Sequence, residues 1–575
     1  MIAPALIPNQ SREASMPVTA RAYLSPTLVL LAYDYPEGEK EPDFLGFAIR
    51  RTPGTDGDEP NYLPNRVGFQ GPDKDGKTEG SDQWPIQKFY WWDARINSAD
   101  RGKKFTYRIS VVRGKPGDLS LSTKAGEFVD LAVTVPLEVE HGIGTYFNRA
   151  VVSSQAFVTE FGHSPTGEKL HEAYVWLGNG MEEVVANFLA QADKDHCSIE
   201  GAIYHLSQSD QGEFIIPAMA AFKGDESLVY HANDDTDKAA IRQLKPAGVE
   251  FAARTKTHIM HDKFLVAVKN NKAQRVVMGS ANYTTEGLTQ QANLMHTWES
   301  SDLADLYLER KRLIASDPTI GATAKEAGWS DVIACGDAKV RAFFPPEPKV
   351  PKGQEGSSIE AVIEAVKGAT SSVVFCLFSP TDLELLDACF AVSDAEKMML
   401  GLINTVPEHE PQPNKKGVTD PVKVAIYNRD RTPSNLEVGG HEAFAKGNTP
   451  MGFSWEDSVL GKGGPYPVFI HHKFLVIDGE TDHPVIYSGS ANMSANSVFY
   501  NDENLLEITE CPRLGQLYLA EFMRLFEHYR ARLAFKLKKN DQNQTFKLTP
   551  DNSWSKDWYA AGSKANSRMA LAAKI

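Results

Sequence analysis

The sequence predicts an α/β protein in which two similar α/β/α repeats pack together, preceded by an N-terminal all-β sandwich domain. Three observations support this fold class. Short β-type runs separated by turns fill residues 17–140, and helix-like segments alternate with strand-like segments from residue 141 onward. One polar pattern also occurs twice, at a separation of 210 residues, which indicates an internal repeat.

Length and composition are those of a multidomain globular protein. The chain of 575 residues is too long for one hydrophobic core, and its 42% hydrophobic and 23% charged residues argue against general disorder. The 60 basic and 75 acidic residues give a formal net charge of −15, which provides no general attraction to nucleic acid or anionic lipid. Five cysteines without metal-binding spacing predict reduced, mostly buried thiols, as in a cytoplasmic protein.

The N-terminal stretch shows no secretion signal. Residues 1–16 read as a flexible tail in which no basic segment leads into an apolar one, and no later run is long enough to span a bilayer. We therefore expect a soluble, cytoplasmic protein without a transmembrane segment. Export by a route that needs no cleavable signal stays open.

Five strands are predicted in the first domain, at residues 27–33, 44–50, 89–93, 105–112 and 128–135. Gly and Pro separate these runs, and no long helical period interrupts them. The segments GFAIRR and FTYRISVVRG resemble those of a fibronectin type III domain, which is a sandwich of this kind. Such a domain is either a rigid cap on the rest of the chain or a binding module, and Trp91 and Trp92 fit both interpretations.

Each α/β repeat contains a helix that leads into a strand. Residues 182–192 carry apolar side chains at helical spacing and precede the strand-like residues 198–207, and residues 359–366 and 372–379 repeat this order. We place the first repeat at 141–350 and the second at 351–540.

The second repeat carries an additional long segment, residues 400–468, which is rich in Pro, Gly and charge. It contains Phe453, Trp455 and Tyr466, and an insertion of this length is either a lid or binding loop or a disordered insert. Residues 513–539 have the spacing of a long amphipathic helix with a solvated, lysine-rich end. Residues 541–575 are predicted to form a C-terminal strap on the body.

The repeated pattern sets a lysine two residues after a histidine. The second repeat has the sequence H-x-K-x4-D followed by G-S-x-N, which supplies His471, Lys473, Asp478, Ser490, Asn492 and, farther on, Glu503. The first repeat supplies His261, Lys263, Ser280, Asn282 and Asn293 in the same register. Val268 stands where the first copy would need the aspartate, and Asn293 stands opposite Glu503, so the first copy is degenerate.

Side chains of these types can attack a phosphodiester. Residues i and i+2 of a strand point the same way, so each motif sets an imidazole beside a cation. Neutral imidazole can attack phosphorus, and a second imidazole can protonate the leaving oxygen. Ammonium and amide groups can hold the phosphoryl oxygens as charge shifts in the transition state. The two half-sites together predict one phosphodiesterase.

The paired stretches resemble the phospholipase D superfamily, whose members share H-x-K-x4-D and the downstream G-S-x-N. The resemblance covers about residues 170–510, and the Q-x-N element at Gln291 with the segment after it resembles bacterial phospholipase D-like proteins. It implies an active site at the interface of the two repeats, a covalent phosphohistidine intermediate, and no required metal or other cofactor. The implied catalytic residues are His261, Lys263, His471, Lys473, Asp478 and Glu503, with Ser280, Asn282, Ser490 and Asn492 binding the phosphate and Asn293 in a supporting role.

Carboxylates of the second repeat favour His471 as the nucleophile and His261 as the general acid. Asp478 and Glu503 would orient the His471 imidazole and raise its basicity. The superfamily resemblance points to the opposite assignment. The histidine spacings at His258 and His472 could suggest metal ligands, but residues i and i+3 of a strand face opposite ways and nothing completes a set, so we predict no metal.

Three functions stay open from the sequence. Hydrolysis or transfer of a phospholipid head group is favoured by two halves in one chain, the aromatic insertion and the acidic net charge. A metal-independent DNA or RNA phosphodiesterase is favoured by the cytoplasmic character and the lack of a membrane-docking helix. A binding or scaffold protein with a degenerate site is the third. One chain can form the whole site, so the oligomeric state is not predicted.

Overall fold

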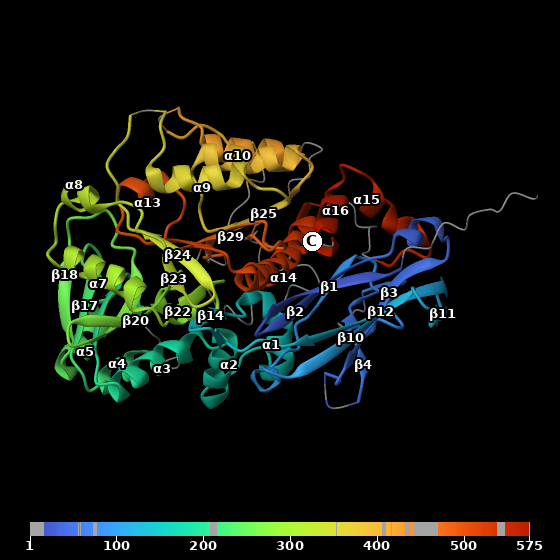
Figure 1. Ribbon diagram of the computed structural model, residues 1–575, viewed down its shortest axis with the longest axis horizontal. Helices are drawn as coiled ribbons and strands as arrows, with labels where there is room; N and C mark the ends of the chain where they lie inside the picture. The colour runs from blue at the N-terminus through green and yellow to red at the C-terminus, as the bar shows by residue number, and fades with distance from the viewer. Residues whose placement is uncertain are drawn as a thin grey trace, which may run out of the picture.

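The computed structural model describes residues 17–573, except for 56, 58, 73–77, 208–214, 352, 405–406, 408–409, 416, 432–436, 441–469 and 538–546. The predicted tail, and Phe453, Trp455 and Tyr466 of the predicted insertion, lie outside the described residues. Figure 1 shows the N-terminal strands on one side of the molecule and the two α/β units on the other, with helix α14 (Pro512–Leu537) between them.

Two sheets form the N-terminal region. One has the order β1-β2-β9, with β1 at Thr19–Ser25, β2 at Leu28–Asp34 and β9 at Tyr90–Asp93. The other has the order β11-β10-β3-β4 with β12 also on β10, where these strands are Asp118–Leu121, Lys104–Lys115, Phe44–Thr52, Asn61–Tyr62 and Phe128–Thr134. Along β10, Phe105, Tyr107 and Ile109 are buried while Arg108 is exposed, which is the alternation of a strand with one buried face. The five predicted strands and the all-β start of the chain are confirmed, whereas the fibronectin type III resemblance stays a prediction.

The two repeats contain eight-stranded sheets of the same topology. The first has the order β13-β14-β22-β20-β19-β15-β17-β18 and the second the order β23-β24-β30-β29-β28-β25-β26-β27. The strands of the first sheet are, in that order, Val139–Glu140, Ile143–Phe147, Leu294–Trp298, Lys272–Gly279, Lys263–Lys269, Ser198–Ile203, Glu226–His231 and Glu250–Arg254. Those of the second are Ile333–Cys335, Ala338–Phe343, Leu505–Thr509, Val485–Gly489, Lys473–Ile477, Ser372–Leu377, Met398–Ile403 and Glu437–Gly440. The predicted internal repeat is therefore a repeat of the whole sheet.

Helices cover these sheets in both repeats, and the short helix α8 of the first repeat has no counterpart among the described helices of the second. In the first repeat they are α3 (Met181–Lys194), α4 (Ile215–Ala221), α5 (Lys238–Leu244), α6 (Thr285–Thr289), α7 (Ser301–Ala315) and α8 (Ile320–Thr323). In the second they are α9 (Ser357–Lys367), α10 (Leu383–Asp394), α11 (Pro421–Arg431), α13 (Ala495–Phe499) and α14. Helix α9 buries Ile359, Val362, Ile363 and Val366, the spacing from which a helix was predicted. Helices α1 (Ser154–Phe161) and α2 (Glu168–Gly178) precede the first repeat's α3. Among the helices described, none is long and apolar enough to cross a membrane.

The predicted insertion at 400–468 contains part of the repeat itself. Helix α11 lies within it, and β27 extends the sheet by pairing in parallel with β26. These two elements occupy the places of α5 and β18 in the first repeat. The sequence of α11, PVKVAIYNRDR, is short and polar, so no apolar periodicity distinguishes it from a loop.

The C-terminal segment packs on the N-terminal sheets. It contains the 3₁₀ turn η6 (Asn552–Ser555), the helices α15 (Lys556–Tyr559) and α16 (Lys564–Ser567), and the turn η7 (Arg568–Ala572). The Trp554 ring stacks on Phe89, with 5.4 Å between the centroids, and its indole nitrogen donates to the carbonyl of Phe44 at 3.2 Å. The hydroxyl of Tyr23 on β1 donates to the carbonyl of Leu571 at 2.7 Å.

Two short parallel bridges join the repeats, and they position the motifs. Met260 pairs with Asp502, and Ile470 pairs with Ala292. Each bridge sets the residue before a motif histidine beside the polar turn of the opposite repeat. The interface thus brings together the two copies of the pattern.

Candidate active site

The two histidine and lysine pairs lie at the junction of the repeats. His261 and His471 lie two residues before the first residues of the central strands β19 and β28, which are the motif lysines Lys263 and Lys473. Each ammonium group donates to the carbonyl of its own motif histidine at 2.6 Å, Lys263 to His261 and Lys473 to His471. Both lysines are fully buried and both histidines are 6% exposed.

Each histidine is oriented by the opposite repeat. The Nδ1 atom of His261 lies 2.6 Å from Oε2 of Glu503, and Nδ1 of His471 lies 2.9 Å from Oδ1 of Asn293. A backbone hydrogen bond also crosses between the repeats, because the amide of His261 donates to the carbonyl of Asp502 at 2.8 Å. The prediction that Glu503 supports His471 is therefore wrong in its geometry, because it assumed that each repeat supplies its own partner.

The serines of the two G-S-x-N elements hold those partners in place. Ser490 Oγ donates to Glu503 Oε2 at 2.7 Å, and Ser280 Oγ donates to Asn293 Oδ1 at 2.8 Å. Glu503 also accepts from Ser497 Oγ at 3.0 Å and from the Asn501 amide at 3.2 Å. The hydroxyls of Ser280 and Ser490, predicted to bind phosphate, are thus engaged with the groups that orient the imidazoles.

The asparagines of the same elements have buried oxygens without a partner. Among the described residues, the Oδ1 atoms of Asn282 and Asn492 are buried and accept no hydrogen bond. An amide oxygen is an acceptor, so a phosphate oxygen would have to meet the side-chain NH2 groups of these asparagines and not these atoms. Their predicted phosphate-binding role stays a prediction.

Asp478 lies at the other end of β28 from His471. It is five residues beyond Lys473, a separation of roughly 16 Å along a strand. Its carboxylate accepts from the amides of Thr370, Ser371 and Ser372 at 2.8–3.1 Å, and so anchors the start of β25. Its φ of 53° lies in the left-handed region, which Asp tolerates better than most residues. The predicted catalytic placement of Asp478 is not found, and the aspartate instead fixes the sheet on which the motif is built.

Burial and clustered positive charge keep the imidazoles neutral. Burial, reinforced by Lys263 and Lys473, holds the pKa of His261 well below its usual value, and the same causes act on His471. Burial lowers the pKa of Lys263 to about 7, and burial with the neighbouring Lys263 lowers the pKa of Lys473 well below its usual value. Burial raises the pKa of Glu503 against the opposing effect of Lys263 and its hydrogen-bond donors. An anionic ligand would offset the crowding of these cations.

Two aromatic residues that the sequence did not single out flank the histidines. The ring of Tyr204 lies edge-on to His261, with 5.0 Å between the centroids, and the Lys263 ammonium is 4.9 Å from its centre. Phe378 lies 5.4 Å from His471 and 5.5 Å from the Lys473 ammonium. Both residues directly follow equivalent strands, β15 and β25. An aromatic residue at the same place in each repeat is the sequence feature from which they could have been predicted.

The two histidines considered as metal ligands have other neighbours. Nδ1 of His258 bonds to Asn501 Oδ1 at 3.0 Å, while the buried His472 ring packs against Phe147 and Phe474. Within the described part of the chain, no group of three or more His, Cys, Asp or Glu side chains could hold a metal ion.

Comparison with known proteins agrees with the geometry. Residues 222–311 and 448–526 match the family model described as cardiolipin synthase, PLD-like domain, and each match contains one histidine and lysine pair. A comparison with curated proteins finds no match.

Several solved structures resemble parts of the chain. Phosphatidylserine synthase from Haemophilus influenzae Rd KW20 is 12% identical with a TM-score of 0.40, covering 62% of this chain and 85% of the synthase. Yeast tyrosyl-DNA phosphodiesterase is 11% identical with a TM-score of 0.33, covering 58% of this chain and 88% of that protein. Polyphosphate kinase from Porphyromonas gingivalis is 10% identical with a TM-score of 0.35, covering 57% of this chain and only 42% of the kinase. The two family-model matches, one for each half-site, show that each half of the α/β core carries a region similar to the PLD-like domain of the cardiolipin synthase type.

Proposed function

We propose that the protein is a phosphodiesterase that forms a covalent phosphohistidine on His261. The observation that carries this proposal is the exchange of partners between repeats, which gives His261 the charged Glu503 and His471 the neutral Asn293. A carboxylate beside Nδ1 fixes the tautomer and raises the basicity of Nε2, as a nucleophile requires. This reverses the assignment of nucleophile that the sequence favoured.

In the first step, Nε2 of His261 attacks phosphorus and the bond to the leaving oxygen breaks. Nδ1–H of His261 donates to Glu503, so the Nε2 lone pair is available while the ring is neutral. The new phosphohistidine carries a positive ring that the Glu503 carboxylate stabilises. Lys263 and Lys473, with the amide groups of Asn282 and Asn492, would hold the non-bridging oxygens.

His471 supplies the proton for the leaving oxygen and then takes one from the incoming water or alcohol. Asn293 is neutral, so it orients the ring without stabilising the imidazolium, and a proton on Nε2 is easily given up. The negative charge of a bound diester favours that proton before the reaction. Attack by water on the phosphohistidine completes hydrolysis, and attack by an alcohol completes transfer.

A phospholipid is the substrate class that we favour. The matching family model is described for cardiolipin synthase, and the aromatic residues Tyr204 and Phe378 give the site apolar walls beside the phosphate position. Head-group hydrolysis or transfer is therefore the first reaction to test. The nuclease and scaffold interpretations become outcomes of the same experiment.

The test offers wild type, His261→Ala and His471→Asn each phosphatidylcholine or phosphatidylethanolamine vesicles and single- and double-stranded DNA, with EDTA present. His472→Asn is the matched control, because His472 is also buried and adjacent in sequence but its ring packs against Phe147 and Phe474. We expect head-group release by wild type and the control alone. Cleavage of DNA without lipid turnover would replace the lipid proposal with a nuclease, and no turnover would favour a scaffold.

Trapping the intermediate tests the assignment of the nucleophile. With a ³²P-labelled diester, His471→Asn should accumulate label because its phosphohistidine breaks down slowly, and peptide mapping should place the label on His261. Label found on His471 in the wild-type protein would contradict the assignment.

A further inference from the structure

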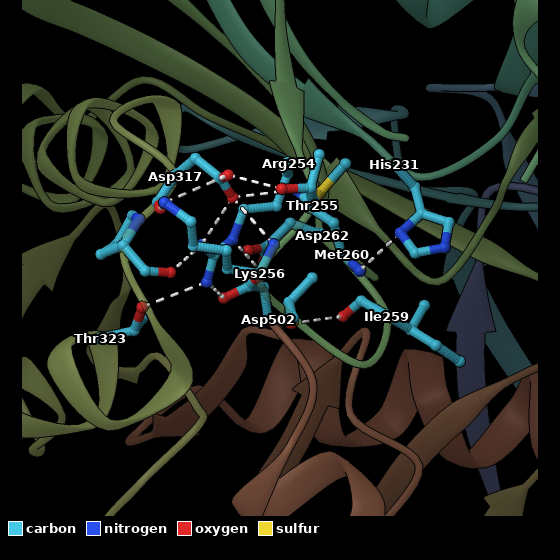
Figure 2. Close-up of polar contacts among 12 residues, drawn as sticks. His231, Arg254, Thr255, Lys256, Ile259, Met260, Asp262, Asp317, Thr323 and Asp502 are labelled. Atoms are coloured by element: carbon cyan, nitrogen blue, oxygen red, sulfur yellow. Dashed lines mark hydrogen bonds and ion pairs between the residues drawn. The ribbon is translucent and has the colours of Figure 1, made fainter. Parts of the chain in front are cut away.

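An ion-pair network whose centre is buried lies near His261. Arg254 ends strand β18, and its guanidinium makes a two-pronged contact with Asp502 of the opposite repeat, with Nε to Oδ2 at 2.8 Å and Nη2 to Oδ1 at 3.2 Å. Figure 2 shows Arg254 between Asp502 on one side and Asp317 and Thr323 on the other. Both Arg254 and Asp502 are 0% exposed.

Two arginines, Arg254 and Arg310, bind the side chain of Asp502, and two hydrogen bonds hold its backbone. Arg310 Nη2 donates to Asp502 Oδ1 at 3.2 Å, and the same guanidinium donates to Asp262 Oδ2 through Nε at 3.2 Å. The Asp502 carbonyl accepts from the His261 amide at 2.8 Å, and its amide donates to the Ile259 carbonyl at 2.9 Å. The next residue along the chain is Glu503, so the network anchors the peptide that carries this carboxylate.

The second half-site has no equivalent anchor among the described residues. There the backbone bond runs from the amide of His471 to the carbonyl of Ala292 at 3.1 Å, and the methyl group of Ala292 stands at the place of the Asp502 carboxylate. His472 likewise stands where the first half has Asp262. Within the part of the chain that the structure describes, this ionic support is found only beside the histidine that is paired with a carboxylate.

We propose that Arg254 is a positioning residue, which holds Asp502 so that Glu503 stays in hydrogen-bond contact with His261. This inference rests on the proposed role of His261 as the nucleophile. A nucleophile must be placed within a fraction of an ångström, and a displacement of about 1 Å can cost ~10²-fold in rate. A bidentate Arg contact in a dry interior provides such a fixed geometry, which Lys cannot reproduce.

The test is the charge-neutral double variant R254M/D502N. It removes one buried cation and one buried anion together, which a protein interior tolerates far better than the loss of a single partner, and the new side-chain amide at position 502 can still accept from Arg310. The matched control is R51M/D93N, because Arg51 and Asp93 form an equally buried pair with a 2.8 Å contact in the N-terminal sheets. Hydrolysis of bis(p-nitrophenyl) phosphate gives kcat and KM, and circular dichroism reports folding.

We expect kcat of R254M/D502N to fall by ~10²-fold with little change in KM, while R51M/D93N keeps the wild-type kcat. The second readout needs no turnover: the downfield proton resonance of His261 Nδ1–H, identified by its loss in His261→Ala, should shift or broaden in R254M/D502N alone. Wild-type kcat together with an unchanged resonance would overturn the proposal, as would equal loss of kcat in the control.

Two further results separate the two ways in which the experiment can fail. If the wild-type protein hydrolyses no diester, the proposed function fails, and the His261 resonance alone decides whether Arg254 positions the Glu503 contact. If the double variant does not fold, Arg254→Lys takes its place, since it keeps the charge and loses the fork. An Arg254→Lys protein with wild-type kcat and resonance would overturn the proposal.

Discussion

Replacing Lys263 by Met should abolish turnover and yet stabilise the folded protein. Lys263 is fully buried, and its ammonium group donates a hydrogen bond of 2.6 Å to the carbonyl of His261. Burial lowers its pKa from 10.5 to about 7, so the folded state gives up much of the proton that the unfolded chain keeps at neutral pH. Losing this proton on folding lowers the free energy of unfolding of the wild type. A Met side chain of similar length carries no proton and avoids this loss.

The size of the effect follows from proton linkage. At pH 7 the depressed pKa costs the folded wild type about 4 kcal/mol, and at pH 9 about 2 kcal/mol, because the unfolded lysine itself approaches its own pKa. Folding lowers the pKa of Lys263, so the unfolded state binds more protons than the folded state between pH 7 and 10.5. The free energy of unfolding of the wild type therefore rises with pH over this window. The lost hydrogen bond and contact with the Tyr204 ring offset roughly 1–2 kcal/mol, so the net gain at pH 7 is about 2–3 kcal/mol.

Urea unfolding of wild type and Lys263→Met at pH 7 and pH 9 measures this difference. We expect the advantage of the variant to shrink by about 2 kcal/mol between the two pH values. Lys272→Met is the control, because Lys272 begins strand β20 in an exposed position and its removal relieves no buried charge. A Lys263→Met protein that is less stable than wild type at pH 7, or whose advantage does not change with pH, would refute the reasoning.

Three further outcomes follow from the site. Glu503→Gln keeps the shape of the side chain but removes the charge beside His261, so kcat for bis(p-nitrophenyl) phosphate should fall by ~10³-fold, and an unchanged kcat would contradict the partner exchange. Asp478→Asn weakens the bonds to the start of β25, so urea unfolding should show a loss of about 2–3 kcal/mol while kcat is kept, and a matching loss of kcat would return Asp478 to the active site. Sulfate should bind ~10-fold more weakly per pH unit above pH 7 by calorimetry, because Lys263 must regain its proton, and an affinity that is independent of pH would argue against sulfate contact with this lysine.

The sequence predicts the repeated architecture well because the repeat is visible in register. Apolar spacing at Ile359 and Val362 predicts a helix, and the equal distances from each histidine to its G-S-x-N element predict equivalent strands and turns. Such patterns depend on contacts within one repeat, and these are local in sequence. The motif histidines and lysines are accordingly found together at the junction of the repeats.

Contacts between the two repeats produce no comparable pattern in the sequence. Glu503 lies 32 residues after His471 in the chain, yet its carboxylate contacts His261, 242 residues away. Register shows which residues are equivalent, but it does not show which copy a side chain meets across an interface. Arg254 and Tyr204 were missed for the same reason, because an arginine or a tyrosine at the end of a strand carries no signal until the opposite repeat is in place.

The packing of the C-terminal segment on the N-terminal sheets sets an order for folding during synthesis. Phe44 and Phe89 emerge from the ribosome long before Trp554 and Leu571, which cover these sheets. The N-terminal sheets therefore keep an uncovered aromatic face until this later segment has been made. Nascent chains of this protein should accordingly depend on chaperones that shield such a face, and release from them should coincide with the arrival of the C-terminal segment.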